Sequence, residues 1–304
     1  MTIDPALFSA ALRALTPILF AALAGALCQR AGIFNISLEG TMLVGCFAGV
    51  AGSWFTGNPW LGVALAVAAS AAFSLVLAVG SVSLGGDAIV ISVAMNLLAV
   101  GLTAFLLRTV FGAQGSFSDP ELRGLDRVRL PLVEEIPLLG PVLSGHSPLV
   151  YVSWLAVAVT AVLLYRCRWG LRLRGLGENP AAAASLGVRV TRQRYLVVVA
   201  GGGLCGLGGA QLALGNVTLF AENMTAGRGW IAVVAVMLGA AAPVGVFLAA
   251  LLFGLAEALG FRLQGLGLPQ QATDAAPYVV TLIALFVSSR RLRRRDPVEG
   301  AVDR

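Results

Sequence analysis

The stretch AIVISVAMNLLAVGLTAFLLRTVF, residues 88–111, carries a single charged side chain, Arg108. A transmembrane helix needs about 20 predominantly apolar residues, and this run is long enough. Inside a bilayer every backbone N–H and C=O needs a partner within the protein, so only helices and closed barrels cross it. Polar and apolar residues do not alternate here as they do in barrel strands. The stretch therefore predicts a membrane-spanning helix.

Similar apolar runs fill most of the chain. Of its 304 residues, 58% are hydrophobic and 12% are charged, whereas about 25% of residues are charged in typical soluble domains. The composition predicts an all-α polytopic membrane protein with about 8–10 transmembrane helices, surrounded by the lipid bilayer. The expected spans are 6–29, 40–56, 60–84, 88–111, 148–165, 195–214, 230–241, 244–262 and 277–289.

Two polar connections, 112–147 and 166–194, interrupt the spans, and the second contains seven arginines and one glutamate. Because loops rich in arginine stay in the cytoplasm, we expect 166–194 inside and 112–147 outside. Counting spans then places the N-terminus outside and the C-terminus in the cytoplasm. We treat 1–290 as one transmembrane domain and 291–304 as a basic cytoplasmic tail. Basic clusters beside apolar spans favour this topology over nucleic-acid binding.

The two halves of the chain are weakly alike. AGIFNISLEGTMLVGCFAG, residues 31–49, follows the first span, and LFAENMTAGRGWIAVVAVMLG, residues 219–239, follows the sixth. Five crossings separate them, which predicts an inverted repeat with broken or re-entrant helices. The segment 230–241 would be about 18 Å long as a helix, too short to cross alone. Chance similarity between glycine-rich apolar segments is the alternative.

Polar residues inside the spans are the candidate pathway residues, because a charge at the bilayer centre is costly and needs a partner or water. Glu257, for example, lies in a span and requires such a partner. We hypothesise that several polar groups face a shared pathway for a hydroxylated solute and that two phenylalanines offer stacking surface. Alternatively, the polar groups only join helices by hydrogen bonds. The candidates are Phe34, Asn35, Glu39, Asn96, Gln211, Phe220 and Glu222.

Motifs for other chemistry are weak. The glycines of GGGLCGLGG, residues 201–209, match a dinucleotide fingerprint in spacing but lie inside a span, so the strand and loop that the motif needs are missing. Gly202 and Gly206 instead have the spacing that allows helices to approach closely in lipid. The four cysteines are scattered and the single histidine, His146, stands alone, so we expect no catalytic residue and no metal site.

LRLRGLGENPAAAASLGV, residues 171–188, predicts a short helix in the cytoplasmic loop. Gly175 and Gly177 are expected to loosen the chain. Asn179 is a good N-cap, Pro180 suits the first helical position, and Gly187 suits the end. The alanines leave a narrow rod that fits a groove on a partner, and the flanking arginines can pair with acidic groups or lipid phosphates. An ordinary loop helix is the alternative.

RWGLRLRGLGENPAAAASLGV, residues 168–188, resembles the coupling loop of permeases from ATP-binding-cassette (ABC) importers for branched-chain amino acids, simple sugars and nucleosides. The resemblance extends over almost the whole chain, and four further segments carry it: GIFNISLEGTMLVG, DAIVISVAMNLLA, MTAGRGWIAVVAVMLG and PVGVFLAALLFGLAEAL. The segment NISLEG is similar to the corresponding segment of the nucleoside and simple-sugar branch. In amino-acid permeases this segment usually ends in a Gly-Gly type pair instead. Asp87-Ala88 departs slightly from the family pattern.

The resemblance implies a type II-like importer permease that forms the pathway for a nucleoside, or a simple sugar, and is not itself an enzyme. It also implies a partner ATPase holding ATP-Mg, a second permease more often different than identical, and an external substrate-binding protein. The chain contains no lysine, so it cannot supply a Walker A motif, and we expect no cofactor in it. The implied coupling residues are Arg174, Gly177, Glu178, Asn179, Pro180, Ala182 and Gly187.

Two alternatives stay open at this point. One is an ion-coupled secondary transporter in which Glu39 or Glu222 carries the ion. Inverted repeats and broken helices suit it equally well, but such a carrier needs no docking helix. The other is an ABC permease for branched-chain amino acids.

Overall fold

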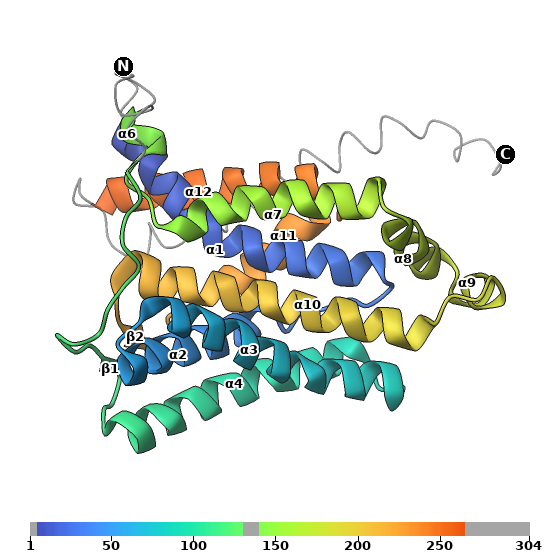
Figure 1. The fold of residues 1–304 in the computed structure, drawn as a ribbon, viewed down its shortest axis with the longest axis horizontal. Coiled ribbons are helices and arrows are strands. Elements are labelled where there is room, and N and C mark those ends of the chain that lie inside the picture. Colours follow the sequence, from blue (N-terminus) through green and yellow to red (C-terminus); the bar gives the residue numbers. More distant parts are fainter. Residues whose placement is uncertain (1–4, 130–139, 265–304) are drawn as a thin grey trace, which may run out of the picture.

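The computed structural model describes residues 5–129 and 140–264, and most of these residues are helical (Figure 1). The main helices are α1 (Pro5–Arg30), α2 (Leu38–Thr56), α3 (Pro59–Leu77), α4 (Ala88–Phe111), α7 (Pro148–Tyr165), α8 (Arg168–Glu178), α9 (Pro180–Ser185), α10 (Val190–Ala210), α11 (Arg228–Leu238) and α12 (Pro243–Gln264). The π-helical segments η1 (Ala78–Ser83) and η2 (Gln211–Val217) extend α3 and α10, and α6 (Gly140–Leu143) is a single turn. The all-α polytopic fold is thereby confirmed.

Seven helices in the described part are long and apolar enough to cross a membrane: Ala6–Arg30, Leu38–Thr56, Pro59–Ser83, Ala88–Phe111, Pro148–Tyr165, Val190–Val217 and Pro243–Leu263. Each corresponds to an expected span. The expected span 230–241 is the short helix α11, whose 11 residues extend only about 17 Å. The expected span 277–289 and the tail 291–304 lie outside the described residues.

Local capping explains where several helices begin. The Asp87 side chain accepts hydrogen bonds from the backbone N–H groups of Ile89 and Val90, at 2.7 and 3.1 Å, and so caps α4. The departure from the family pattern at this position therefore leaves a working N-cap. In the same way, Asn58 accepts a bond from Trp60 N at 2.9 Å at the start of α3, with Pro59 in the first turn.

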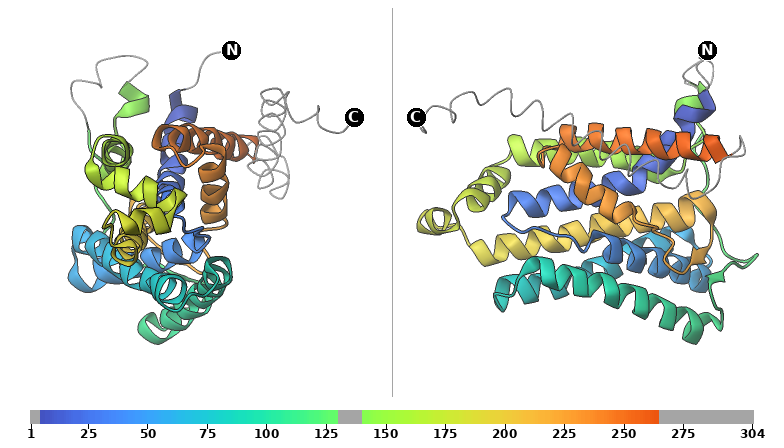
Figure 2. Two further views of the ribbon diagram at one scale, coloured as in Figure 1. Left: turned by 90° about the vertical axis from the view of Figure 1, so that its right-hand side faces the viewer. Right: turned by 180° about the vertical axis from the view of Figure 1, so that it is seen from behind.

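The helix α1 occupies the centre of the bundle (Figure 2), where it packs against α10, α11 and α12. In the apolar spans of α4 and α7, by contrast, fewer than a third of the residues are buried. Glycines bring α10 close to α3. A Cβ at Gly202 would lie 2.4 Å from Ser74 Oγ, and one at Gly206 would lie 2.5 Å from Ala66 O. The prediction that these two glycines serve helix packing is confirmed.

The helices α1 and α10 run in opposite directions. The helix α1 ends beside α8 at one end of the bundle, and α10 begins there, directly after α9 (Figure 1). Each is followed by a non-helical break, at 31–37 and 218–227, and then by α2 or α11. At the other end, β1 (Ser116–Phe117) pairs antiparallel with β2 (Phe220–Ala221), which ties the two polar connections together. This arrangement has the order that an inverted repeat predicts.

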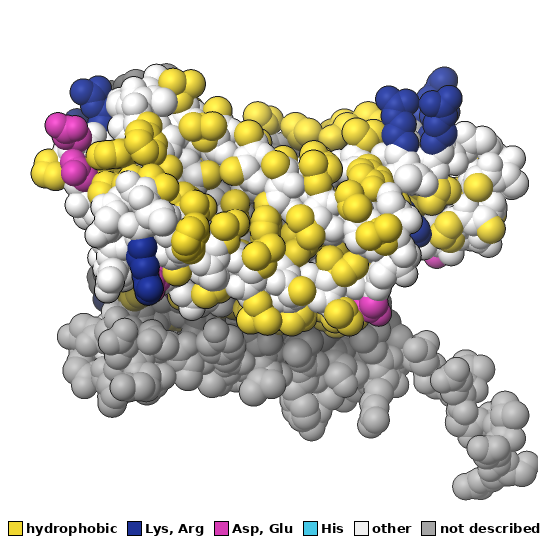
Figure 3. All heavy atoms as spheres, turned by 90° about the horizontal axis from the view of Figure 1, so that it is seen from below, with side chains coloured by type: hydrophobic (Ala, Val, Ile, Leu, Met, Phe, Trp, Pro, Cys, Tyr) yellow, Lys and Arg dark blue, Asp and Glu magenta, His cyan; other side chains and the backbone are white. Residues whose placement is uncertain are grey.

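Figure 3 shows one flank of the bundle. Yellow apolar side chains cover the long middle section, and dark-blue arginine side chains lie at its two ends. Such a distribution suits a flank that faces lipid between two charged, water-facing ends.

Candidate functional site

The break between α1 and α2 is a structured turn. The Asn35 side chain accepts hydrogen bonds from Ser37 N at 2.9 Å and from Ser37 Oγ at 2.7 Å. Asparagine often stabilises turns by bonding to the backbone two residues on. Both side chains are buried, so this turn fixes the entry into α2 inside the bundle.

The Glu39 carboxylate connects the two breaks. Its Oε1 accepts a hydrogen bond from Gly227 N at 2.8 Å, and its Oε2 accepts one from Gly229 N at 2.5 Å. Glu39 lies in the first turn of α2, and both donors lie at the start of α11. One negative charge thus meets the positive ends of two helix dipoles. With 7% of its surface exposed, Glu39 is almost completely enclosed by protein.

Glycine is required where the two helix ends meet. A Cβ at Gly229 would lie 2.4 Å from both N and Cα of Glu39. Gly227 has a φ of +85°, a left-handed conformation that side chains other than glycine rarely adopt. The sequence GRG therefore lets the start of α11 approach α2 within the bundle.

Asn96 holds the start of α2 from the side of α4. Its Oδ1 accepts a hydrogen bond from Gly40 N at 2.8 Å, and its Nδ2 donates one to Ile36 O at 3.1 Å. Asn96 lies well inside α4, which spans residues 88–111, so α2 begins at a level between the two ends of α4. The Asn96 amide therefore forms its hydrogen bonds with the backbone around the break between α1 and α2.

A charge pair lies next to the place where the starts of α2 and α11 meet, which we call the junction. Arg228 and Glu257 form a salt bridge between α11 and α12, with 18% and 11% of their side-chain surfaces exposed. Glu257 Oε2 is buried and has no hydrogen-bond partner among the described residues. The sequence indicated that Glu257 needs a partner, but it did not identify Arg228. The missed signal is an arginine at the start of a short apolar segment, because such a charge also needs a counter-charge.

The remaining pathway candidates from the second half of the chain lie towards β1 and β2. Gln211 is fully buried, accepts a hydrogen bond from Ser147 Oγ and donates one to Asn216 Oδ1 at 2.9 Å. Phe220 is fully buried, with its ring centroid 5.4 Å from that of Phe47 in an edge-to-face arrangement. Glu222 is about one-third exposed and lies 4.0 Å from Arg108 Nη2.

The structure therefore separates the predicted pathway residues into two groups. Asn35, Glu39 and Asn96 surround the start of α2, whereas Gln211, Phe220 and Glu222 belong to the strand-bearing end. Among the described residues, no hydrogen bond joins the two groups. Phe34 is 37% exposed and lines a small crevice of about 10 Å³ against α1 and α11. Of the predicted residues, Phe34 offers the most open apolar surface at the junction.

The predicted rod is α9. Asn179 Oδ1 accepts a hydrogen bond from Ala182 N at 3.0 Å, Pro180 is the first helical residue, and Gly187 follows the end with a φ of +80°. These capping predictions are confirmed. The expectation that Gly175 and Gly177 loosen the chain is wrong, because both lie inside α8. Two fully buried leucines on α8, Leu173 and Leu176, anchor the helix against the bundle, and this packing outweighs the low helix propensity of glycine.

Gly177 is the point where α8 touches α1. A Cβ there would lie 2.4 Å from Arg30 O. The Arg30 side chain in turn donates hydrogen bonds to Ala241 O at 3.0 Å and Ala240 O at 2.9 Å, in the turn between α11 and α12. The end of α8, the end of α1 and this turn thus form one contact, around a polar crevice of about 240 Å³.

The other predicted coupling residues surround this contact or lie on the rod. The guanidinium of Arg174, which also lines the crevice, lies 5.2 Å from the centre of the Tyr165 ring. Glu178 and Ala182 are exposed to solvent at the end of α8 and on α9. The rod therefore presents small, accessible side chains, while its base is fixed to the bundle.

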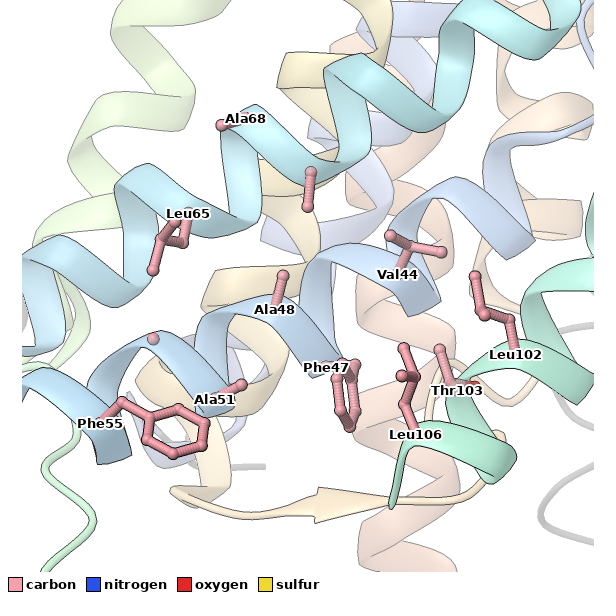
Figure 4. A pocket seen from close by; sticks show the side chains of 12 residues that line it. Val44, Phe47, Ala48, Ala51, Phe55, Leu65, Ala68, Leu102, Thr103 and Leu106 are labelled. Atoms are coloured by element: carbon pink, nitrogen blue, oxygen red, sulfur yellow. The ribbon is translucent and has the colours of Figure 1, made fainter. Parts of the chain in front are cut away.

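A cavity of about 580 Å³ lies between α2, α3 and α4 (Figure 4). The side chains around it are aliphatic and aromatic, apart from Thr103, whose hydroxyl already donates to Ala99 O at 2.8 Å. A solute with several hydroxyl groups would lose its hydrogen bonds with water there and gain none. This cavity suits hydrocarbon rather than a polar solute.

Within the described residues, no cluster of three or more His, Cys, Asp or Glu side chains is placed to hold a metal ion.

Comparison with known proteins gives consistent results. A family described as branched-chain amino acid transport system / permease component matches residues 7–286. The guanosine ABC transporter permease NupQ of Bacillus subtilis is 35% identical over 88% of this chain and 87% of its own length. The nucleoside ABC transporter permease NupC of Lactococcus lactis is 37% identical over 93% and 92%, respectively. A putative glucose ABC transporter permease, TsgC13 of Haloferax volcanii, is 36% identical over 88% and 80%.

The two bacterial species each have a second, more distant relative of this chain. These are the guanosine permease NupP, 26% identical, and the nucleoside permease NupB, 22% identical. No solved structure matches the chain significantly. The matched span, the identities and the helical architecture agree, and they confirm the resemblance carried by the sequence motifs. The chain is therefore a multi-pass membrane protein that belongs to the family of branched-chain amino acid transport system permease components.

Proposed function

We propose that this chain is the membrane-spanning permease subunit of an ATP-driven importer for nucleosides. Support comes from the similarity to guanosine and nucleoside permeases over about nine-tenths of the chain. Simple sugars are the second candidate, because a glucose permease is similar to nearly the same degree. Both solute classes present a hydroxylated ring. The family description mentions branched-chain amino acids, but the similar relatives named above are permeases for nucleosides and glucose.

The observation that carries the ATP-driven mechanism is a protruding rod whose base is fixed to the bundle. The helix α9 projects beyond the membrane-spanning helices (Figure 1), while Gly177 packs α8 directly onto the end of α1. Leu186, which follows α9, is 85% exposed, and in our proposal it provides an apolar contact for the partner. In our proposal the rod docks into a groove of a separate ATPase, which holds the ATP and Mg²⁺.

Movement of the rod then has a route into the bundle. Displacing α8 displaces the end of α1, and Arg30 transmits this to the turn that ends α11. At its other end, α11 is joined through Glu39 to the start of α2. Packed helices usually shift between discrete arrangements rather than deform, so α2 and α11 would move together between outward-open and inward-open states. The rod accordingly lies in the cytoplasm and the N-terminus outside.

A second permease completes the pathway in this proposal. Two differently named guanosine permeases, NupQ and NupP, occur in one species, and two nucleoside permeases, NupC and NupB, occur in another, which supports two different permeases rather than two copies of one. Phe34 lies on an open face beside the breaks, where a facing subunit could enclose a solute. An external substrate-binding protein delivers the nucleoside to the outer end.

The test uses the complete importer in proteoliposomes with labelled guanosine. We expect uptake to require ATP on the rod side and to be unaffected when ion gradients are abolished. Uptake driven by an ion gradient without the ATPase would instead support the secondary-transporter alternative. Competition by unlabelled nucleosides, pentoses, hexoses and branched-chain amino acids then identifies the substrate class.

The docking of the rod is tested by Leu186→Arg, with Leu186→Met as the matched control. Because the side chain is almost fully exposed, neither change should disturb the permease fold. We expect Leu186→Arg to reduce co-purification of the ATPase and nucleoside uptake, while the Met variant retains both. Normal docking of the Arg variant would contradict the proposed role of the rod.

A further inference from the structure

A second feature at the rod-bearing end is a pocket rich in arginine. It has a volume of about 340 Å³ and lies where α8, the α9–α10 connection and the first turns of α10 meet. We call it the arginine pocket, and its lining consists of Trp169, Arg172, Gly187, Val188, Arg189, Arg192, Gln193 and Leu196.

The charges in this pocket are unbalanced. Three arginines line it, Arg172, Arg189 and Arg192, and no acidic residue does. Across residues 5–129 and 140–264, the salt bridges are Arg108–Glu222 and Arg228–Glu257, neither of which involves the pocket. Like charges gathered without a counter-charge favour binding of an anion.

The pocket also has an apolar wall that faces the membrane. Arg192 and Leu196 lie four residues apart on α10 and therefore on the same face, with Leu196 about 6 Å further into the membrane-spanning part. Leu196 is 49% exposed. Trp169, which α8 contributes to the lining, is half-buried, and tryptophan is typical of the membrane–water interface. Arg192 near the end of the span and Leu196 deeper in it correspond to the headgroup and acyl-chain layers of a phospholipid.

A hydrogen-bonding group completes the lining. The Oε1 atom of Gln193 is buried and has no partner among the described residues. As an acceptor, this oxygen can take a hydrogen bond from a hydroxyl group of a glycerol-based headgroup. The pocket therefore offers charge, hydrogen bonding and apolar contact in one place.

We propose that the arginine pocket binds the phosphate of an anionic phospholipid, such as phosphatidylglycerol, in the leaflet next to α8. Basic pockets between transmembrane helices at this level are suited to anionic headgroups. An acidic surface of the ATPase fits less well, since it would have to reach Leu196 beside the acyl-chain region. The bound lipid would join α8 to α10 and so hold the base of the rod in place.

The test compares the full-length permease in nanodiscs of phosphatidylcholine with and without phosphatidylglycerol. The pocket variant is Arg189→Gln/Arg192→Gln. The matched control is Arg166→Gln/Arg168→Gln, which removes the same charge from exposed positions of the same loop outside the pocket. We expect phosphatidylglycerol to raise the unfolding temperature of the unmodified protein and of the control, and to have little effect on the pocket variant.

Three results would overturn the proposal. The first is an equal response of both variants, because this would indicate general attraction to a charged membrane. The second is an equal stabilisation by inorganic phosphate in pure phosphatidylcholine, which would indicate a site for free anions. The third is loss of ATPase docking by the pocket variant alone in phosphatidylcholine, which would identify an ATPase contact. If the pocket variant is unstable, Arg189→Lys/Arg192→Lys replaces it and should retain part of the lipid response, whereas complete insensitivity to the lipid composition would overturn the proposal.

Discussion

The side chain of Glu39 accepts a hydrogen bond at 2.8 Å from the backbone N–H of Gly227, 188 residues further along the chain. This bond, with its partner from Gly229, joins the start of α2 to the start of α11. Glu39 was a candidate for contact with the solute, and the structure shows what else it does. Its carboxylate accepts hydrogen bonds from two N–H groups at the start of α11, which would otherwise lack a partner inside a membrane protein.

Replacing Glu39 with Gln separates these roles. One carboxylate oxygen becomes an NH₂ group, so a buried N–H of α11 loses its acceptor at a cost of about 1–3 kcal/mol. We expect a lower unfolding temperature together with reduced uptake. Glu121→Gln, at an exposed loop position, is the control and should change neither. Lost uptake with unchanged stability would instead indicate that the carboxylate serves the solute.

Gly177→Ala should uncouple the rod from the bundle. Its Cβ would lie 2.4 Å from Arg30 O, so α8 must move away from the end of α1. We expect ATPase activity to continue while uptake per ATP hydrolysed falls several-fold. Gly175→Ala is the matched control, because nothing lies within 4 Å of a Cβ there, and it should behave as the unmodified protein. Equal behaviour of both variants would exclude this contact from coupling.

The pair of Arg228 and Glu257 should show strong energetic coupling. Arg228→Met leaves Glu257 as an uncompensated charge in a largely buried site, and Glu257→Leu does the reverse. Breaking a buried ion pair in this way typically costs about 3–5 kcal/mol, and partial exposure places the expected cost near the lower value. Removing both charges should restore much of the stability. A double-mutant cycle of unfolding measurements tests this, and additive losses would show that the two side chains act independently.

His146 should make stability depend on pH. It is buried, its Nε2 lies 2.8 Å from Val142 O, and burial, reinforced by Arg13 and Arg127, lowers its pKa below 6.5. Below about pH 6.5 the unfolded chain therefore takes up a proton more readily than the folded protein. The contribution of neutral His146 to the free energy of unfolding is fully present above that pH, and it is lost as the pH falls through the lowered pKa of the folded protein. His146→Gln should flatten this part of the unfolding profile, and an unchanged slope would contradict the assignment.

Much of the fold follows from local patterns. The lengths of the apolar runs predicted seven described spans, and Asn179, Pro180 and Gly187 predicted the rod, because both features depend on neighbouring residues. The long-range contacts did not follow. The helix α2 is apolar and buried on nearly all sides, so its sequence gives no direction for Glu39. Gly177 indicated flexibility locally, yet it serves a close contact with Arg30 that only the folded chain reveals.

The bond between Glu39 and Gly227 also constrains how the protein is made. During synthesis the ribosome adds Glu39 long before Gly227. The first half of the chain therefore enters the membrane before α11 can donate hydrogen bonds to the Glu39 carboxylate. Until then, water or the insertion machinery must satisfy this charge. The first repeat can therefore reach its final arrangement only after most of the chain has been translated, and the two halves mature as one unit.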